Sequence, residues 1–264
     1  MDEVQESRSE SRPAGRPAVG HGPVAPVEPP SGGGAPAPDR VEADWDAYWS
    51  TESTGIKRLY DVIAVIYLLF IIKPALNHYM KRYFAPGDPV LHAGCGGGQV
   101  DVDVVKRLNV TALDNSPKAL ERYRALNGPN CTMLEGSILD MPADAGSFAG
   151  IYNLGVMEHF YEDDIVNILR QFHRVLRPAG RLVLFWPPRY GLPNRVLRFV
   201  HYLINDVFKK SLKLHPDEFS PIESRAQVER WLNRTGFSLV AFSFGPRDLF
   251  THVIVVAERA RSRP

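Results

Sequence analysis

Residues 90–98 read VLHAGCGGG, a short apolar strand that runs directly into glycines at positions 94, 96, 97 and 98. Glycine is used where the backbone must adopt a positive φ or approach a ligand closely, because a Cβ atom would obstruct either. A strand, a glycine loop and a following helix form a common cradle for a nucleotide-like cofactor. This stretch therefore predicts a cofactor site at the end of the first strand of an α/β fold.

The spacing of the glycines narrows the choice of cofactor. Dinucleotide-binding proteins use G-x-G-x-x-G, whereas this chain has G-x-G-x-G and places Gln99 at the sixth position. A second apolar strand at 110–113 ends at Asp114, about twenty residues after Gly94. An acidic residue at that distance accepts hydrogen bonds from ribose hydroxyls. These features favour a nucleoside cofactor other than a dinucleotide.

Apolar segments alternate with helical segments along the rest of the chain, which requires a mostly parallel sheet with helices on both faces. The last two apolar runs, 237–244 and 251–257, are separated by a Gly-Pro turn and predict an antiparallel hairpin. The other predicted elements are strands at 131–135, 148–153 and 181–186, a helix at 165–176, and helices beginning near Gln99, Pro117 and Ser220-Pro221.

Together these segments resemble the class I S-adenosylmethionine-dependent methyltransferases over residues 86–259. The glycine loop resembles motif I of that family, and the run RVLRPAGRLVLF at 174–185 is among its more specific signatures. The resemblance implies an α/β Rossmann-like fold, with a mostly parallel seven-stranded sheet and a C-terminal antiparallel hairpin. It also implies an enzyme of the EC 2.1.1 type that uses S-adenosyl-L-methionine and needs no metal.

The resemblance further implies which residues bind the cofactor. The glycines approach its methionine part, and its carboxylate lies near the helix expected to begin around Gln99. Asp114 binds the ribose, while Asn115 and the backbone of Ser137-Ile138 contact the adenine. The implied set is His92, Gly94, Cys95, Gly96, Gly98, Asp114, Asn115, Ser137, Ile138, and finally Asn153 and Leu154, which line the wall beside the transferable methyl group.

Three positions depart from the family's pattern. His92 stands where relatives often have an acidic residue that fixes the cofactor's ammonium, Ser137 replaces a common Asp, and Ala149 replaces another. A histidine does not attract an ammonium as a carboxylate does, and Asp101 or Asp103 could supply the missing charge. These departures keep open an alternative function, a catalytically inactive binding or scaffold protein with the same fold.

His159 is the candidate general base, because imidazole titrates near neutrality and the residue follows the fourth strand. A base is needed only if the methyl acceptor is a hydroxyl or another protonated nucleophile. The alternative is that Glu158 and His159 brace the loop after that strand.

Composition suggests one catalytic domain with additions at its N-terminal side. The chain has 264 residues, 44% hydrophobic content and a net charge of +1, which argues against a nucleic-acid binder. Residues 1–44 predict a disordered Pro/Gly/Ala-rich tail without a secretory signal, residues 45–85 an N-terminal helical cap, and residues 86–264 the methyltransferase domain with a lid insertion at about 189–214. Only two cysteines are present, and the expected location is cytoplasmic.

Two apolar segments bear on the acceptor. The uncharged run 62–72 is too short to span a bilayer and predicts either a buried helix covering the pocket or a membrane-contacting one. The basic amphipathic segment 192–213 predicts a lid over an apolar substrate or a second membrane contact. The expected acceptor is therefore a small, partly hydrophobic or lipid-like molecule, with peripheral membrane contact as an alternative. The oligomeric state is not predicted.

Overall fold

The computed structural model describes residues 56–129, 131–191 and 219–260, and side chains from residue 62 onward. The predicted tail at 1–44 and the basic segment 192–213 lie outside the described residues, as does the predicted lid beyond residue 191.

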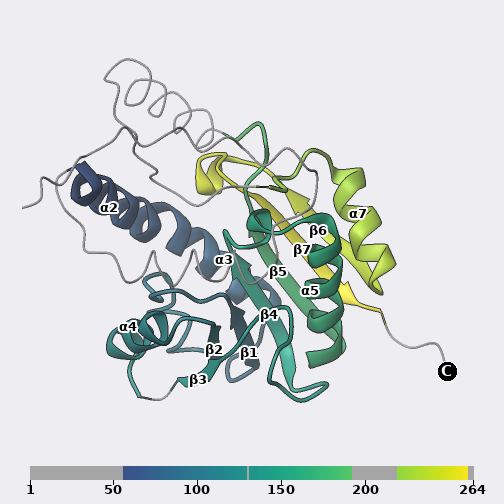
Figure 1. Cartoon of the computed structure of the whole chain (residues 1–264), viewed down its shortest axis with the longest axis horizontal. Helices are drawn as coiled ribbons and strands as arrows, with labels where there is room; N and C mark the ends of the chain where they lie inside the picture. Colours follow the sequence, from purple (N-terminus) through teal and green to yellow (C-terminus); the bar gives the residue numbers. More distant parts are fainter. Residues whose placement is uncertain (1–55, 130, 192–218, 261–264) are drawn as a thin grey trace, which may run out of the picture. The chain divides into compact units, whose positions relative to one another are not determined.

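A seven-stranded sheet with the order β3-β2-β1-β4-β5-β7-β6 forms the centre of the described part (Figure 1). Strands β1 to β5 pair in parallel, whereas β7 runs antiparallel to both β5 and β6. The predicted parallel sheet with a terminal hairpin is thus confirmed. The strands are β1 Pro89–Ala93, β2 Asn109–Asp114, β3 Thr132–Glu135, β4 Phe148–Leu154, β5 Leu176–Trp186, β6 Phe237–Ser243 and β7 Val253–Arg259.

Helices cover both faces of the sheet, and the side chains of β5 show why. Leu182 and Leu184 belong to the apolar cluster formed with α5 and α7, whereas Val183 and Phe185 belong to the cluster formed with α3 and α4. This alternation follows from the two-residue period of a strand that is buried on both sides. The helices are α2 Ile56–Tyr67, the π-helix η1 Leu68–Ile72, α3 Lys73–Tyr83, α4 Pro117–Asn127, the short η2 Met157–His159, α5 Glu162–Val175, α7 Arg225–Arg234 and the short η4 Pro246–Asp248.

The helix expected to begin near Gln99 is not formed. Residues 99–108 are all described and follow a series of turns, with Val105 N donating to Asp101 O and Leu108 N donating to Val104 O. Valines at positions 102, 104 and 105 disfavour a regular helix, because a β-branched side chain loses rotamer freedom against the preceding turn. The prediction of a helix here was wrong.

The last helix also begins later than predicted. Helix α7 starts at Arg225, where Ser224 Oγ accepts a hydrogen bond from Gln227 N at 3.2 Å. Residues 220–222 are instead held against the segment that follows β5, since Ile222 N donates to Pro187 O and Arg189 N donates to Ile222 O. A serine whose side chain caps the next turn outweighs the Ser220-Pro221 signal.

Helices α2, η1 and α3 follow one another without interruption, and burial changes along them (Figure 1). In α3, Ala75, Leu76 and Met80 are buried in the core, whereas most of the apolar side chains that are described in α2, from residue 62 onward, are exposed. The expectation of a buried pocket cover is therefore wrong for most of residues 62–70. The helix Val62–Tyr83 spans 22 residues, and an 18-residue window within it has a mean hydropathy of 1.6, so within the described chain one helix has the length and composition of a membrane span.

Gly150 of β4 provides a test of the packing between α3 and the sheet. A Cβ atom at Gly150 would overlap the ring of Phe84, the buried residue that follows α3. We expect Gly150→Ala to lower the free energy of unfolding by about 1–3 kcal/mol, because overpacking forces neighbouring side chains to move. Urea denaturation measures this change.

Gly245→Ala is the matched control, because nothing lies within 4 Å of its added Cβ and we expect a change within about 0.5 kcal/mol. Combining Gly150→Ala with Phe84→Leu should recover part of the loss. Equal effects of the two alanine substitutions would contradict this account of the packing.

Candidate functional site

The loop after β1 turns tightly and is fixed to the neighbouring strand. Gly94 and Gly98 have φ values of +71° and +70°, which residues with a Cβ rarely adopt. A Cβ at Gly94 would also lie 2.8 Å from Cγ2 of Val156. The amides of Gly94 and Cys95 both donate to Leu113 O, at 2.9 and 3.0 Å. The glycines thus let the loop fold back against the end of β2.

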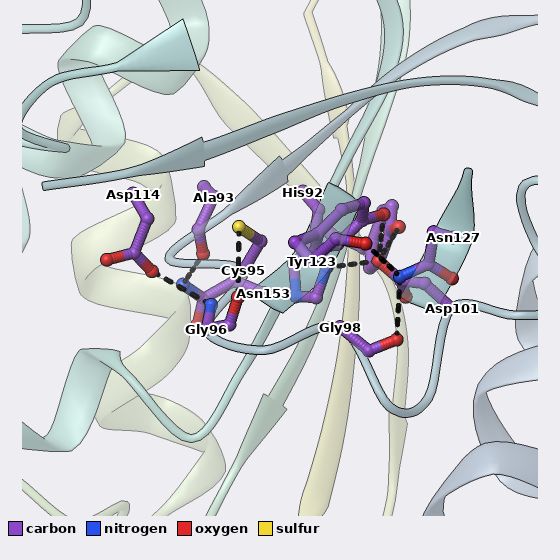
Figure 2. A network of polar contacts seen from close by, with 11 residues as sticks. His92, Ala93, Cys95, Gly96, Gly98, Asp101, Asp114, Tyr123, Asn127 and Asn153 are labelled. Carbon is purple, nitrogen blue, oxygen red and sulfur yellow. Dashed lines mark hydrogen bonds and ion pairs between the residues drawn. The ribbon is translucent and has the colours of Figure 1, made fainter. Parts of the chain in front are cut away.

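Asp114 at the end of β2 holds the same loop through its carboxylate. Gly96 N donates to Oδ2 at 2.8 Å (Figure 2), and Ser116 N donates to Oδ1 at 3.0 Å. Burial raises the pKa of Asp114 above its ordinary value, although these two amides oppose the shift. Each carboxylate oxygen retains capacity to accept a further hydrogen bond, because an ionised carboxylate offers about four acceptor positions.

A cavity of about 260 Å³ lies where β1, β2, β3 and β4 end. Ligands of open α/β sheets bind at this edge, beyond the carboxyl ends of the parallel strands. All of loop 94–100 lines the cavity. The predicted cofactor-binding residues on its wall are His92, Gly94, Cys95, Gly96, Gly98, Asp114, Asn115, Ile138 and Leu154.

Asn153 and the backbone of Ser137 were also predicted to contact the cofactor, but neither residue is among those that line the cavity. Asn153 is fully buried, and its Nδ2 donates to Ala93 O at 2.7 Å. Ser137 Oγ accepts a hydrogen bond from Leu139 N at 3.0 Å. Neither residue lines the cavity, and their side chains bind Ala93 and Leu139, which are sequence neighbours of the lining residues Gly94 and Ile138.

Several wall residues escaped the sequence reasoning. Leu68 reaches the cavity from η1, and its only sequence signal was membership of an uncharged apolar run. Gln99 was predicted to exclude a dinucleotide and to begin a helix, but not to contact the cofactor itself, yet it lines the cavity together with Val156 and Phe160. Val156 and Phe160 follow β4, where the sequence patterns pointed only to Asn153-Leu154 and to the ionisable pair Glu158-His159.

Cys95 contributes an uncharged thiol to this wall. Burial raises its pKa far above the ordinary value, and the neighbouring carboxylates of Asp114 and Asp101 raise it further. The Sγ atom donates a long hydrogen bond of 3.5 Å to Gly96 O. The side chain therefore acts as a small apolar group, since only a thiolate is a strong nucleophile.

A buried polar cluster centred on Asp101 lies beneath the loop (Figure 2). Its Oδ2 is 2.6 Å from His92 Nδ1 and accepts hydrogen bonds from the hydroxyls of Tyr123 at 2.6 Å and Tyr152 at 2.9 Å. Burial raises the pKa of both tyrosines, so both hydroxyls remain protonated donors. The cluster joins β1, α4, β4 and the segment after the loop.

This cluster explains how His92 can stand where relatives often have an acidic residue. Because a carboxylate only accepts, Nδ1 carries the proton, and Nε2 is left as an acceptor in the neutral ring. His92 lines the cavity and stacks on Tyr152, with ring centroids 4.3 Å apart. Asp101 is thus the acidic partner beside His92. Asp103 is not, because it pairs with Lys73 at 3.0 Å and Lys106 at 3.1 Å.

His159 does not line the cavity. It is 1% exposed, and its Nε2 lies 3.8 Å from Oε1 of the buried Glu158. The carbonyl of Glu158 accepts hydrogen bonds from Phe219 N at 2.7 Å and Ser220 N at 2.9 Å. These contacts favour the hypothesis that the pair braces the loop after β4 over the hypothesis that His159 is a general base.

Comparison with known proteins agrees with this geometry. Residues 90–180 match the family described as "Methyltransferase domain". An uncharacterized methyltransferase of Synechocystis sp. is 34% identical over 115 residues, which cover 39% of this chain and 54% of that protein. A ubiquinone biosynthesis O-methyltransferase of Xanthomonas campestris pv. campestris is 30% identical over 115 residues, covering 41% of this chain and 47% of that protein. The chain spans about half the length of these curated relatives.

Solved structures share the fold at low sequence identity. Magnesium protoporphyrin IX methyltransferase from Synechocystis PCC 6803, solved with bound SAH, superposes with a TM-score of 0.57 at 15% identity. The match covers 84% of this chain and 97% of that one. The described part of the chain therefore has the fold of the class I S-adenosylmethionine-dependent methyltransferases, and residues 90–180 match the methyltransferase-domain family.

Asp101→Asn tests the buried cluster. All three donors bind Oδ2, and Oδ1 has no hydrogen-bond partner among the described residues, so the amide removes the negative charge and buries two unpaired N–H donors at the Oδ1 position. We expect a loss of about 1–3 kcal/mol in the free energy of unfolding, measured in urea. The surface substitution Asp103→Asn should change stability by less than about 1 kcal/mol. A similar loss of unfolding free energy in both variants would show that the buried cluster contributes no more to stability than a surface carboxylate does.

His159→Gln separates the two roles of the Glu158-His159 pair. If the pair braces the loop, as the burial indicates, the melting temperature falls while the dissociation constant for S-adenosylhomocysteine stays within about twofold of wild type. Calorimetric titration and thermal unfolding measure the two quantities. An unchanged melting temperature would remove the support for bracing.

Proposed function

We propose that this protein is an S-adenosylmethionine-dependent methyltransferase that acts on a small, partly hydrophobic acceptor. The observation that carries the proposal is the arrangement of Asp114 and the glycine loop on one cavity wall. The loop brings peptide groups to the wall, and Asp114 presents a carboxylate beside them. A nucleoside with a charged amino-acid part needs both features.

The residues present fit this cofactor. Asp114 has a raised pKa because it is buried, and additional hydrogen-bond donors stabilise its ionised form. Two vicinal ribose hydroxyls are such donors. Across the cavity, Ile138 offers an apolar contact for the adenine, next to Asn115 at the end of β2. His92, backed by Asp101, presents an acceptor that can serve the ammonium group where relatives often use a carboxylate.

Bound S-adenosylmethionine supplies an electrophilic methyl group, so the chain itself has to bind, orient and exclude water. Asp114 fixes the ribose, and the loop 94–100 holds the methionine part by its backbone. Leu154 and Val156 line the wall that follows β4, and Phe160 adds apolar cover. With few polar groups on that side, the cavity favours desolvation of the reacting atoms.

The apolar wall also supports the acceptor class. Leu68, Val156 and Phe160 offer no charge to an incoming acceptor. The Xanthomonas relative is named for ubiquinone biosynthesis, and the Synechocystis structure is named for magnesium protoporphyrin IX. We propose a small acceptor that has both apolar and polar parts. His159 remains a proposed base only for an acceptor that must lose a proton.

Asp114→Ala tests the cofactor assignment. Removing the carboxylate should weaken binding of S-adenosylhomocysteine by at least about tenfold, because hydrogen bonds to charged groups contribute about 1.5–3 kcal/mol. In wild type, affinity should also weaken as the pH falls toward the raised pKa of Asp114, since the protonated acid accepts more weakly. Isothermal titration calorimetry over a pH series measures both effects.

The substitution Asp144→Ala serves as a control, because Asp144 is exposed and does not line the cavity. Its affinity should match wild type. If wild type neither binds S-adenosylhomocysteine nor gains thermal stability at saturating ligand, the enzyme proposal fails and the scaffold alternative stands, since a ligand that binds only the folded state must stabilise it.

A further inference from the structure

Residues 62–72 of α2 and η1 carry no charged side chain and expose an apolar face. Tyr67, Leu68, Ile71 and Ile72 lie on the side that is buried or half-buried. A helix that is apolar all round is normally buried in a protein core or a membrane. The opposite side is open and carries Val62 at 51% exposure, Ile63 at 56%, Val65 at 38%, Ile66 at 51%, Leu69 at 36% and Phe70 at 73%.

A second apolar segment lies beside this helix. Leu249 and Phe250 follow η4, have exposures of 50% and 46%, and adopt φ values of +56° and +57°. Large apolar residues in the left-handed region are strained and persist only where surrounding contacts impose them. Here Phe250 N donates to Gly245 O at 2.9 Å, and Tyr67 donates to Thr251 Oγ1 at 2.6 Å, which ties the loop to α2.

A cationic groove borders the two apolar segments. His78 and Arg82 from α3 and Arg247 from η4 line a cavity of about 550 Å³. Burial lowers the pKa of His78, and the charges of Arg247 and Arg82 lower it further, so the three groups lie within electrostatic reach. The acidic neighbour Asp248 points away from solvent and is 2% exposed, accepting hydrogen bonds from Thr251 Oγ1 and His252 N.

The helix cannot span a bilayer without dismantling the core. A span needs about 20 residues, which would include both α2–η1 and α3. Yet Leu76 and Ala75 are fully buried, and Tyr79 packs edge-on against Phe185 of β5 at 6.0 Å. Only the α2–η1 half is free to meet lipid, so the geometry is that of a helix lying on a membrane surface.

We propose that the exposed face of α2–η1, together with Leu249 and Phe250, docks on an anionic phospholipid bilayer, with lipid phosphates in the groove between Arg82 and Arg247. Apolar side chains next to clustered arginines match the acyl and headgroup layers of such a membrane. Because Leu68 of η1 lines the cofactor cavity, the same helix connects the two sites. The docking itself does not depend on methyl transfer, and it adds a peripheral membrane location to the expected cytoplasmic one.

Vesicle flotation of the full chain tests the docking. Wild type should float with vesicles of phosphatidylcholine and phosphatidylglycerol, and much less with phosphatidylcholine alone. Phe70→Ser combined with Phe250→Ser should reduce partitioning at least about tenfold, because two large apolar contacts are lost. Arg82→Gln and Arg247→Gln should each reduce binding to the anionic vesicles about fivefold, corresponding to about 1 kcal/mol per basic residue.

Leu126→Ser is the matched control, since Leu126 is 48% exposed on α4, a helix that packs against β2 and β3. It should float as wild type does. All variants should keep the wild-type melting temperature and affinity for S-adenosylhomocysteine. A loss of vesicle binding in these variants can therefore be distinguished from a failure of the proposed methyltransferase function.

Two outcomes would overturn the proposal. One is that wild type stays at the bottom of the gradient with anionic vesicles, or that the aromatic and arginine variants float as wild type does. The other is that wild type elutes as a dimer that the serine variant converts to a monomer, without any vesicle binding, which would make the face a self-association surface.

Discussion

The carboxylate of Asp101 accepts hydrogen bonds from side chains of three separate elements, His92 of β1, Tyr123 of α4 and Tyr152 of β4. A carboxylate buried without such partners would cost far more than the chain can offset. Satisfying it requires all three elements to meet at one point. The loop after β1 is then held from both sides, by Leu113 O at its start and by this cluster where it ends.

Two buried carboxylates near the loop have different roles because their donors differ. Asp101 is bound by three side chains and does not line the cavity. Asp114 is bound by backbone amides from the loop and from Ser116, and it does line the cavity. Asp101 therefore fixes the architecture, whereas Asp114 retains acceptor capacity for a ligand. His92 connects the two, since it is bound to Asp101 and lines the same cavity as Asp114.

Much of the fold could be predicted from the sequence, because strands buried on both faces produce uninterrupted apolar runs and the glycines mark the first crossover. The cavity wall was largely predictable too, since its residues follow strand ends at regular places. The Asp101 cluster was not, because Tyr123 and Tyr152 come near His92 only once α4 has packed on the sheet. Local sequence signals gave wrong predictions where tertiary contacts determine the backbone. The Ser220-Pro221 signal predicted a helix start, for example, but the backbone N–H of Ser220 donates to the carbonyl of Glu158 instead.

The apolar run at 62–72 shows a further limit of sequence periodicity. Lys73 N donates to Leu68 O, five residues earlier, so η1 contains a wider turn than an α-helix. That turn changes the angular phase of the side chains that follow it. The apolar side of α3 can then face the sheet, while α2 leaves apolar residues on its open side. A sequence search at a fixed period of 3.6 residues treats residues 62–72 as one continuous apolar face and predicts that the whole face is either buried or exposed. The inserted π-turn allows two environments, and it lies at the residue, Leu68, where the exposed helix meets the cofactor cavity.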